Sequence, residues 1–493
     1  MNSLKILHSI RSFCSKRETL GIEDKLLIEF LDKDPRLGKV IEQAYKNFVS
    51  LKKKYAKDLQ LDEKLQVQEV QKHFVNFYHK ATINPYVSIA ACGPWVVTSC
   101  GAVVHDSGGY GMLGFGHGPE FVEEALCDPT NVMANIMTAN YSQKKLSELL
   151  LKEIGHTRPD SKKGRLSHFI CLNSGSESVS MAMRLADLHA HIQINTKTNS
   201  PHHNKKLKYI ALEKAFHGRT DFPAQVSDSC LANYKKHLAS FHARDNLITV
   251  RLNNLEDLEK AFVEADKNNI YIPAMLMEPV MGEGSPGLAI TPEFYQLARN
   301  LTKKYDSLLI IDSIQAGIRA HGCLSVLDYP GFQDLEVPDC ETYSKALNAG
   351  QYPFSVIAMN DKTASLYKTG IYGNTMTTNP RALAVACSVL KRLTPEIRNN
   401  INKKGKEFVM KGKQLANDFP KVVTYVQGTG LLCAIGINPD FMKVIGEDGL
   451  EVRLRKLGVG VIHGGENALR FTPPFDITSA EIDLIFSVIR KLF

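Results

Sequence analysis

The residue of the sequence most suggestive of chemistry is Lys345, which stands between a short strand pattern and a glycine-containing loop. The β-forming residues Thr342 and Tyr343 precede it, and Gly350 follows it. A lysine at the end of a strand, on a loop that glycine allows to approach a ligand, is placed to form a Schiff base with a carbonyl compound. The chain holds 60 Lys and Arg residues, most of them expected on the surface, so Lys345 needs support from other motifs.

A second candidate is Asp312, which ends the apolar run 308–311. Such a run is typical of a strand that is buried on both faces of a parallel sheet. Open α/β sheets bind ligands at the carboxyl ends of these strands, and Gln315 follows shortly after Asp312. Asp312 is therefore a candidate ligand-binding carboxylate, with a simple turn cap as the alternative.

Residues 166–190 combine a strand pattern, a glycine-containing loop and a helix pattern. Ser174 and Glu177 have the spacing of a capping box, which places the helix N-terminus at Gly175 and Ser176. The free backbone N–H groups at such a terminus, with the helix dipole, bind anions. The loop is neither a P-loop nor a G-x-G-x-x-G sequence, so it does not indicate a nucleotide. A capped helix without a ligand is the alternative.

These motifs occur in a definite order, with residues 215–220 (AFHGRT) and 277–285 (MEPVMGEGS) between the capped helix and Asp312. The series from residue 93 to 493 resembles the class III (omega) aminotransferases. These are pyridoxal-phosphate enzymes of fold type I, and they include the ornithine, acetylornithine, 4-aminobutyrate and lysine aminotransferases. Each motif alone is weakly specific, but the ordered set is strongly so.

The resemblance implies an α/β protein with a mostly parallel sheet in a large domain and a smaller α/β C-terminal domain. A chain of 493 residues, 44% of them hydrophobic, is long enough to bury the cores of two or more domains. We expect a basic helical extension at 1–80, the N-terminal part of the small domain at 81–130, the large cofactor-binding domain at 131–393 and the C-terminal small domain at 394–493.

The same resemblance assigns the cofactor site. Lys345 would hold pyridoxal phosphate as an internal aldimine and then move the proton during transfer. Asp312 would pair with the protonated pyridine nitrogen, whose charge makes the ring an electron sink. The remaining implied contacts are Gly175 and Ser176 to the phosphate, Phe216 to the ring face, Gln315 to O3′ and Thr375 to the phosphate of the neighbouring subunit. A homodimer with shared active sites follows, and no metal is implied.

Four further residues are assigned to the substrate by resemblance. Arg470 lies in a segment similar to the family's R-F-x-P-P motif and would bind the substrate α-carboxylate. Glu283 would pair with Arg470 while an omega-amine is bound and release it when glutamate arrives. Arg219 would hold a substrate carboxylate through its planar guanidinium. Tyr110 matches a substrate-facing tyrosine of the ornithine enzymes, and a core tyrosine is the alternative.

We therefore predict an aminotransferase of amino-acid metabolism that transfers a terminal (omega) amino group from an amino acid or amine to 2-oxoglutarate. Two alternatives stay open. One is a pyridoxal-phosphate enzyme of the same fold with another reaction, such as an aminomutase or a decarboxylase, and the other is a non-catalytic dimeric scaffold. The amino donor is not identified, because selection by chain length depends on the shape of the pocket.

Several positions depart from the family pattern. Ser313 replaces the glutamate of the usual D-E-V/I-Q, and Asn374 replaces the serine of G-S-T. The arginine of the following glycine segment is shifted to Arg319 or lost. The lysine, the aspartate and the carboxylate-binding arginine all remain, so we expect an active enzyme whose substrates are unsettled.

Residues 1–17 differ in composition from the rest of the chain. They contain four Lys or Arg residues, four serines and no acidic residue, and Ile6, Ile10 and Phe13 recur at helical spacing. This composition is typical of a mitochondrial presequence, with an ordinary basic tail as an equal alternative. The first interpretation places the protein in the mitochondrial matrix and the second in the cytoplasm.

Charge and cysteine content limit the partners. Residues 1–80 hold 16 Lys or Arg against 11 Asp or Glu, which accounts for +5 of the net charge of +8, so nucleic acid is not indicated. The ten cysteines form no C-x-x-C pair, which fits reduced thiols better than a disulfide framework. No apolar run reaches the roughly 18 residues that span a bilayer, so no membrane partner is expected.

Local patterns also predict individual elements. In the N-terminal extension we expect helices at 23–32, 39–57 and 62–78, with a helix breaker at Asp34-Pro35. Further along we expect an antiparallel hairpin around 95–97 and 102–104, and strands at 168–172, 209–212, 274–277 and 340–343. We also expect that Asn379-Pro380 begins a helix over 381–393, with the proline at its first helical position.

Overall fold

The computed structural model describes residues 3–132, 136–159, 164–195 and 199–493. The chain divides into two compact units. The terminal unit combines Met1–Glu120 with Lys403–Phe493, and the large unit is Phe121–Asn402. The two ends of the chain therefore fold together, and the central part forms a body of its own.

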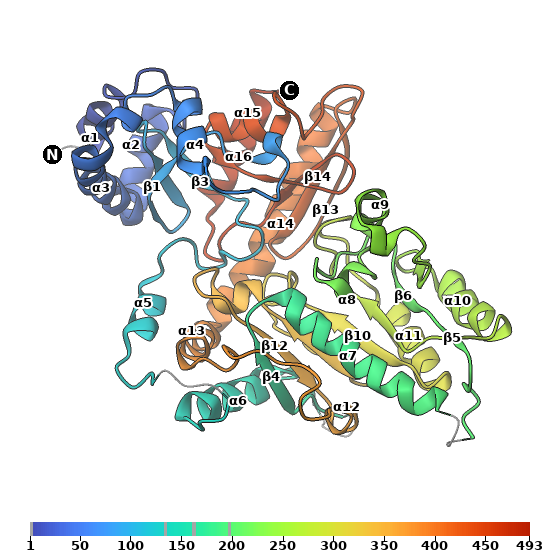
Figure 1. The fold of residues 1–493 in the computed structure, drawn as a ribbon. Coiled ribbons are helices and arrows are strands. Elements are labelled where there is room, and N and C mark those ends of the chain that lie inside the picture. Colours follow the sequence, from blue (N-terminus) through green and yellow to red (C-terminus); the bar gives the residue numbers. More distant parts are fainter. Residues whose placement is uncertain (1–2, 133–135, 160–163, 196–198) are drawn as a thin grey trace. The chain divides into compact units, whose positions relative to one another are not determined.

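The large unit is built on a seven-stranded sheet in the order β4-β12-β11-β10-β9-β6-β7 (Figure 1). Neighbouring strands are parallel except for the two pairs made by β12. The mostly parallel sheet predicted for fold type I is thus confirmed. The strands are β4 (His168–Leu172), β6 (Tyr209–Leu212), β7 (Leu247–Val250), β9 (Ala274–Met277), β10 (Leu308–Asp312), β11 (Cys340–Tyr343) and β12 (Ser355–Met359), and the short β5 (Lys206–Leu207) and β8 (Ile270–Tyr271) form a separate parallel pair.

The strands of this sheet are buried on both faces, as the apolar run before Asp312 predicts. Leu308 and Ile310 join the core under α7, which runs along one face of the sheet (Figure 1). Side chains alternate along a strand, so Leu309 and Ile311 point to the other face, and they are equally buried. The longer helices of this part of the chain are α5 (Glu120–Cys127), α6 (Tyr141–Glu153), α7 (Gly175–Ile194), α9 (Asp228–His237), α10 (Leu255–Lys267), α11 (Pro292–Lys304) and α13 (Pro380–Lys391), and α8 (Asp221–Ala224) and α12 (Asp361–Ser365) are short. Helix α14 (Pro395–Asp418) begins in the large unit, and most of it belongs to the terminal unit.

Two helix starts are determined by capping residues. The Ser174 hydroxyl accepts from the N–H of Glu177, and the Glu177 carboxylate accepts from the N–H of Ser174. The predicted capping box is thus confirmed, and it starts α7 at Gly175. Asn379 caps α13, which has Pro380 at its first position as predicted.

The terminal unit contains two four-stranded sheets. In the first, β3 pairs in parallel with β15, which joins a strand from each end of the chain. The predicted hairpin is confirmed as the antiparallel pair β2 and β3. The sheets are β1 (Ser88–Cys92), β2 (Trp95–Thr98), β3 (Val103–Asp106) with β15 (Val459–Gly460), and β13 (Val423–Thr429), β14 (Leu432–Ile437), β17 (Ala468–Phe471) with β16 (Ile462–Gly464). The helices are α1 (Ser3–Arg11), α2 (Asp24–Lys33), α3 (Pro35–Leu59), α4 (Glu63–Gln71), α15 (Leu450–Lys456) and α16 (Ser479–Arg490).

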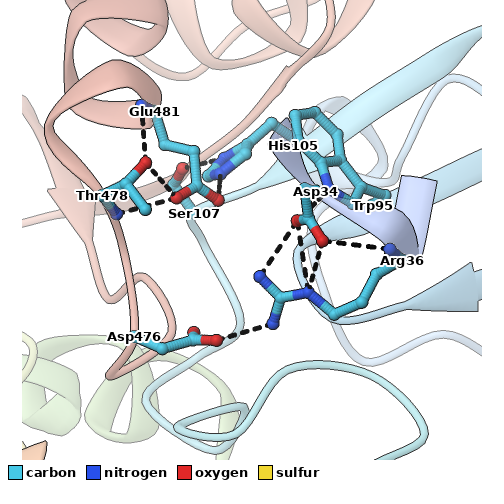
Figure 2. A network of polar contacts seen from close by, with 8 residues as sticks. All are labelled: Asp34, Arg36, Trp95, His105, Ser107, Asp476, Thr478 and Glu481. Atoms are coloured by element: carbon cyan, nitrogen blue, oxygen red, sulfur yellow. Dashed lines mark hydrogen bonds and ion pairs between the residues drawn. The ribbon is translucent and has the colours of Figure 1, made fainter. Parts of the chain in front are cut away.

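A polar network around Asp34 joins the N-terminal helices to the rest of this unit (Figure 2). Asp34 caps α3 and accepts hydrogen bonds from Trp95 Nε1 at 2.8 Å and from the guanidinium of Arg36. Arg36 also contacts Asp476 at 2.6 Å. The predicted breaker at Asp34-Pro35 therefore acts as a cap, and α3 begins four residues earlier than predicted.

A second contact in Figure 2 joins strand β3 to the last helix. His105 Nε2 lies 3.2 Å from the carboxylate of Glu481, which also accepts from the backbone of Thr478. Burial raises the pKa of Glu481, but the hydrogen bond and charge of His105 outweigh it and lower the pKa overall. The last helix is thereby held to the N-terminal sheet.

The N-terminal segment is packed into the terminal unit. Ile6, Leu7 and Ile10 of α1 are buried, and Cys14 forms a disulfide with Cys100. The expectation of ten reduced thiols is wrong for this pair, because cysteines 86 residues apart give no local signal of pairing. The other eight cysteines are free.

Helix α4 ends at Gln71 instead of continuing to residue 78. The apolar side chains that follow, Phe74, Val75 and Phe77, are exposed. A helix in a protein is stabilised mainly by burial of its apolar face, so α4 does not continue where that burial is lacking. Among the described residues, no helix combines the length and apolar character needed to cross a membrane.

Candidate active site

Strands β10 and β11 bring Asp312 and Lys345 to the same edge of the large sheet. The two strands are parallel, and Asp312 lies opposite Thr342. Lys345 begins a short 3₁₀ turn (Lys345–Asn348) directly after β11. Its Nζ atom donates to Oε1 of Gln315 at 2.5 Å. Three residues that the sequence singles out separately are therefore gathered at one edge.

The backbone of Lys345 has a φ of 38°, in the left-handed region that lysine rarely adopts. The surrounding turn holds this conformation in place. Ser344 Oγ and Asn348 Nδ2 both donate to the carbonyl oxygen of Phe354, at 2.7 and 3.0 Å. Unfavourable backbone angles of this kind cluster at functional sites.

Asp312 is buried and held by three donors. His217 Nδ1 contacts Oδ2 at 2.8 Å, and the hydroxyl of Thr342 and the N–H of Ile314 donate to Oδ1 at 3.3 and 3.1 Å. His217 is itself buried. Burial alone would lower the pKa of His217, but the hydrogen bond and charge of Asp312, with the charge of Glu278, raise it. The carboxylate of Asp312 thus favours a protonated His217, and the short contact between the two side chains orients the carboxylate.

Glu278, directly after β9, joins two loops of the site. Its carboxylate accepts from the N–H of Phe216 at 3.0 Å and from the N–H of Gly282 at 2.8 Å. Burial raises the pKa of Glu278 to about 7. Glu278 therefore orders the segment that carries Phe216 and the glycine loop that reaches Gln315, whose Nε2 donates to the carbonyl oxygen of Gly282 at 3.1 Å.

The loop 216–219 lies directly against the start of α7. Gly218 has a φ of 124°, and a Cβ atom there would lie 2.3 Å from Oγ of Ser176. The N–H of Arg219 donates to the same Oγ at 3.2 Å. A glycine is needed at position 218 because any side chain would separate the loop from the helix terminus.

A cluster of charged and aromatic side chains lies beside these loops and consists of Phe216, Arg219 and Glu283. The guanidinium of Arg219 lies 5.2 Å from the ring centre of Phe216, within the range of a cation–π contact. Burial would lower the pKa of Arg219, but Cys230 and Glu283 outweigh this effect and raise it. Phe216 and Glu283 are both half-buried.

The segment 373–375 lies beside the start of α7 in its own chain. Asn374 accepts from Nδ2 of Asn173 at 3.0 Å and donates to Oε1 of Glu177 at 2.9 Å. Thr375 is exposed. Its contact with the cofactor of a neighbouring subunit stays a prediction. Arg319, the shifted arginine, is completely buried in the large unit.

Tyr110 and Arg470 belong to the terminal unit, whereas the other predicted site residues belong to the large unit. Arg470 is buried on β17. The ring of Tyr110 lies 5.5 Å from that of Tyr78, and burial raises the pKa of its hydroxyl. The exchange of partners between Glu283 and Arg470 stays a prediction.

With this geometry established, comparison with known proteins identifies the family. The family model described as "Aminotransferase class-III" matches residues 80–493. The chain belongs to the class III aminotransferases. Members of this class depend on pyridoxal phosphate, so the chain is a pyridoxal-phosphate-dependent transaminase.

Curated relatives of the aminotransferase include enzymes that are 30% identical to it over the aligned residues. It is 30% identical over 326 residues to the acetylornithine aminotransferase of Clostridium acetobutylicum. This alignment covers 66% of this chain and 76% of the relative. It is 30% identical over 381 residues to the succinylornithine transaminase of Salmonella newport. This alignment covers 76% of this chain and 84% of the relative. All of these relatives are aminotransferases, so the aminomutase, decarboxylase and scaffold alternatives gain no support.

Solved structures show the same fold. The ornithine aminotransferase from Toxoplasma gondii ME49 superposes with a TM-score of 0.72 at 22% identity, covering 89% of this chain and 96% of that one. The acetylornithine aminotransferase from Elizabethkingia anophelis gives a TM-score of 0.66 at 23% identity, covering 87% and 98%. The fold of the aminotransferase is thus shared with enzymes that are distant in sequence.

The residues at the sheet edge fit pyridoxal phosphate. The cofactor has an aldehyde, a pyridine nitrogen and a phosphate, and the aminotransferase offers Lys345, the buried carboxylate of Asp312 and the N-terminus of α7. The close approach of Gly218 to Ser176, which a Cβ atom would prevent, shows that this terminus is lined with backbone and small side chains. Such a lining suits a phosphate group.

His217 and Glu278 contribute to the site although sequence reasoning gave them no role. His217 lies next to Phe216, which was singled out, and Glu278 follows a predicted strand as Asp312 does. A polar residue after a buried parallel strand was therefore an available signal for Glu278. The contact between His217 and Asp312, 95 residues apart, had no local signal.

Proposed function

We propose that this aminotransferase transfers a terminal (omega) amino group from an amino acid or amine to 2-oxoglutarate, with pyridoxal phosphate attached to Lys345. The observation that carries the proposal is the contact of Lys345 with Gln315 beside the buried pair of Asp312 and His217. Relatives named acetylornithine aminotransferase and succinylornithine transaminase support a donor of the ornithine type.

Bound pyridoxal phosphate supplies an aldehyde that takes up the amino group and a ring that withdraws electrons. Asp312 would pair with the ring nitrogen and keep its proton there, and His217 would fix the orientation of that carboxylate. After the substrate amine has displaced Lys345 from the cofactor, its Nζ would take the proton from the substrate carbon and give it to C4′ of the cofactor. Gln315, which accepts from Nζ in this structure, would bind O3′ of the cofactor once Lys345 is attached to it.

The remaining residues bind and orient. The N–H groups of Gly175 and Ser176 hold the phosphate at the start of α7, where the helix dipole favours an anion. Phe216 covers one face of the ring. Thr375 of the partner subunit completes the phosphate site, so the working unit is a homodimer.

Substrate selection is assigned to four residues. Arg470 binds the α-carboxylate of glutamate through two parallel hydrogen bonds, and Glu283 pairs with Arg470 when the bound donor has no carboxylate there. Arg219 binds a distal carboxylate, and Tyr110 contacts the donor side chain. One pocket then accepts two substrates of different charge by forming or breaking one ion pair.

The reaction is tested by a donor screen. Purified protein with pyridoxal phosphate and 2-oxoglutarate is incubated with ornithine, acetylornithine, lysine or 4-aminobutyrate, and glutamate is measured. We expect glutamate with at least one donor and none with Lys345→Ala. Lys368→Ala, which removes an exposed lysine of the same unit, serves as the matched control and should retain full turnover. Substantial turnover by Lys345→Ala would reject the assigned lysine.

The shared site is tested by mixing two inactive proteins. Lys345→Ala and Thr375→Ala each disable one contribution to a site. In a mixed dimer, one of the two sites takes its intact Lys345 from the Thr375→Ala chain and its intact Thr375 from the Lys345→Ala chain. That site therefore keeps both residues. Mixing after mild dissociation should therefore recover activity. No recovery, with mixed dimers shown to form, would mean that Thr375 acts within its own chain.

We also propose that residues 1–17 stay part of the folded protein and are not removed as a mitochondrial presequence. The support is the burial of Ile6, Leu7 and Ile10 and the disulfide between Cys14 and Cys100. Mass spectrometry of the protein from its native cells tests the proposal. A mature chain that begins near residue 18 would overturn it.

A further inference from the structure

A buried carboxylate that the proposed mechanism does not use lies on β11, the strand that precedes Lys345 and pairs with β10. Glu341 is 0% exposed. The hydroxyls of Ser313 and Ser325 and the N–H of Val326 donate to it, the last two at 2.6 and 2.9 Å. Burial raises the pKa of Glu341 to about 7, although these three donors act in the opposite direction. Glu341 thus joins β11, the end of β10 and the loop at Ser325.

The register of β10 and β11 shows how Glu341 is related to the site. Asp312 lies opposite Thr342, and the Thr342 hydroxyl donates to Asp312, so these two side chains share one face. Glu341 and Ser313, one residue away on each strand, share the opposite face. Glu341 therefore acts through the strands and not on the cofactor directly. The N–H of Ser313 also donates to the carbonyl oxygen of Thr342 at 3.0 Å, which continues the pairing beyond the end of β10.

Ser313 is one of the positions at which this chain departs from the family pattern, because it replaces the glutamate of D-E-V/I-Q. A serine there cannot supply the carboxylate, but its hydroxyl reaches one on the neighbouring strand. We propose that Glu341 is a positioning residue that provides, from β11, the carboxylate the family pattern carries at position 313. It holds the ends of β10 and β11 so that Asp312 and Lys345 stay in their working arrangement. This inference rests on the roles proposed for those two residues.

The physical reason is the cost of unpaired polar groups. Without the carboxylate, two buried hydroxyls and one buried N–H lose their acceptor, which is costly away from water. The strand end at Ser313 and the loop at Ser325 would then move to satisfy these groups. A displacement of about 1 Å at a site of this kind reduces the rate by about 100-fold.

Four variants of the full-length protein test the inference. They are Glu341→Val, Ser313→Glu, the double variant with both changes, and Asp339→Asn as the matched control. Asp339 is another buried carboxylate of the same strand pair, at the other end, where it accepts from the N–H of Leu309 at 2.8 Å and from Arg299 at 2.6 Å. The double variant moves the carboxylate back to β10.

Each variant is assayed in three ways: thermal unfolding of the apo-protein, titration with pyridoxal phosphate, and kcat with the KM of the amino donor. We expect Glu341→Val to weaken cofactor binding about 10-fold and to lower kcat by about 10–100-fold, with the KM of the donor within about 2-fold. The double variant should recover most of both losses. Ser313→Glu alone should be impaired, because it places two carboxylates together. Asp339→Asn should unfold at a lower temperature but bind the cofactor as the wild type does.

A double variant no better than Glu341→Val would overturn the inference, as would an equal loss of cofactor affinity in Asp339→Asn. A separate result would reject the proposed function. Wild-type protein that binds pyridoxal phosphate but transfers no amino group rejects that function, and the cofactor titrations of the four variants still decide the role of Glu341.

Discussion

Nδ1 of His217 lies 2.8 Å from Oδ2 of Asp312, and both side chains are buried. This contact joins the loop after β6 to the end of β10, two segments that are far apart in the sequence. A buried carboxylate needs hydrogen-bond partners in place of water, and the imidazole is one of them. It also fixes the direction in which the carboxylate faces the cofactor site.

Replacement of His217 should therefore reduce catalysis and also lower the stability of the apo-protein, in which Asp312 would be buried without its imidazole partner. His217→Phe removes a hydrogen bond to a charged group worth about 1.5–3 kcal/mol, which corresponds to roughly 10–100-fold in kcat/KM. His237→Phe, at the end of α9, is a control with no contact to Asp312. The steady-state rates of both variants decide the matter, and unchanged kcat/KM in His217→Phe would show that Asp312 is oriented without the imidazole.

The burial of Glu278 predicts a pH dependence of stability. Its folded-state pKa of about 7 lies above the ordinary value of 4.5. The stabilisation from the neutral form is therefore complete below pH 4.5 and is lost as the pH rises through 7. Between about pH 5 and 8 the unfolding free energy of wild-type apo-protein should fall relative to Glu278→Gln by roughly 1–3 kcal/mol. Urea unfolding at several pH values measures this, and parallel curves for the two proteins would contradict it.

Gly218 should tolerate no side chain. Gly218→Ala places a Cβ atom 2.3 Å from Oγ of Ser176 at a φ of 124°. The cost is about 1–3 kcal/mol of backbone strain, together with displacement of the loop from the start of α7. Cofactor affinity should fall with it. Gly38→Ala, in helix α3 with its nearest contact at 3.9 Å, is the control and should be neutral or stabilising. Equal cofactor affinity in the two variants would refute the close approach.

The packing of α1 predicts that its apolar residues contribute to stability. Ile10→Ala leaves a cavity and should lower the unfolding free energy by about 2–5 kcal/mol. Lys5→Ala changes an exposed residue of the same helix and should stay within about 0.5 kcal/mol of wild type. Chemical unfolding of both proteins tests the expectation. Two variants of equal stability would indicate that α1 is detached in solution.

The proposed exchange of partners by Arg470 predicts an unequal effect on the two substrates. Arg470→Ala should raise the KM of glutamate by roughly 10–100-fold, because a carboxylate loses a paired contact, and should change the KM of the omega-amine far less. Arg490→Ala removes an arginine paired with Asp418 in the same unit and should affect neither. The KM values are measured in both directions of the reaction. Equal increases for glutamate and the amine would rule out the exchange.

Residues whose roles depend on neighbours in the chain were predictable from the sequence. Lys345 after its strand, Asp312 after an apolar run and the capping box of Ser174 and Glu177 all follow from local patterns, and the structure has these elements within a few residues of the predicted bounds. The order of the motifs was sufficient to predict the fold class. The helix predicted to reach residue 78 ends at Gln71 of α4. Apolar residues continue beyond it, but no neighbouring surface buries them, and the local pattern cannot show this.

Tertiary structure alone decided the contacts between distant segments. The pairing of His217 with Asp312, of Ser313 with Glu341 and of Cys14 with Cys100 joins residues that are 95, 28 and 86 positions apart. The same holds for the terminal unit, in which both ends of the chain share one sheet. Propensity and capping act over one or two turns of chain. Which buried donor meets which acceptor depends on how strands are ordered in a sheet, and no local pattern encodes that order.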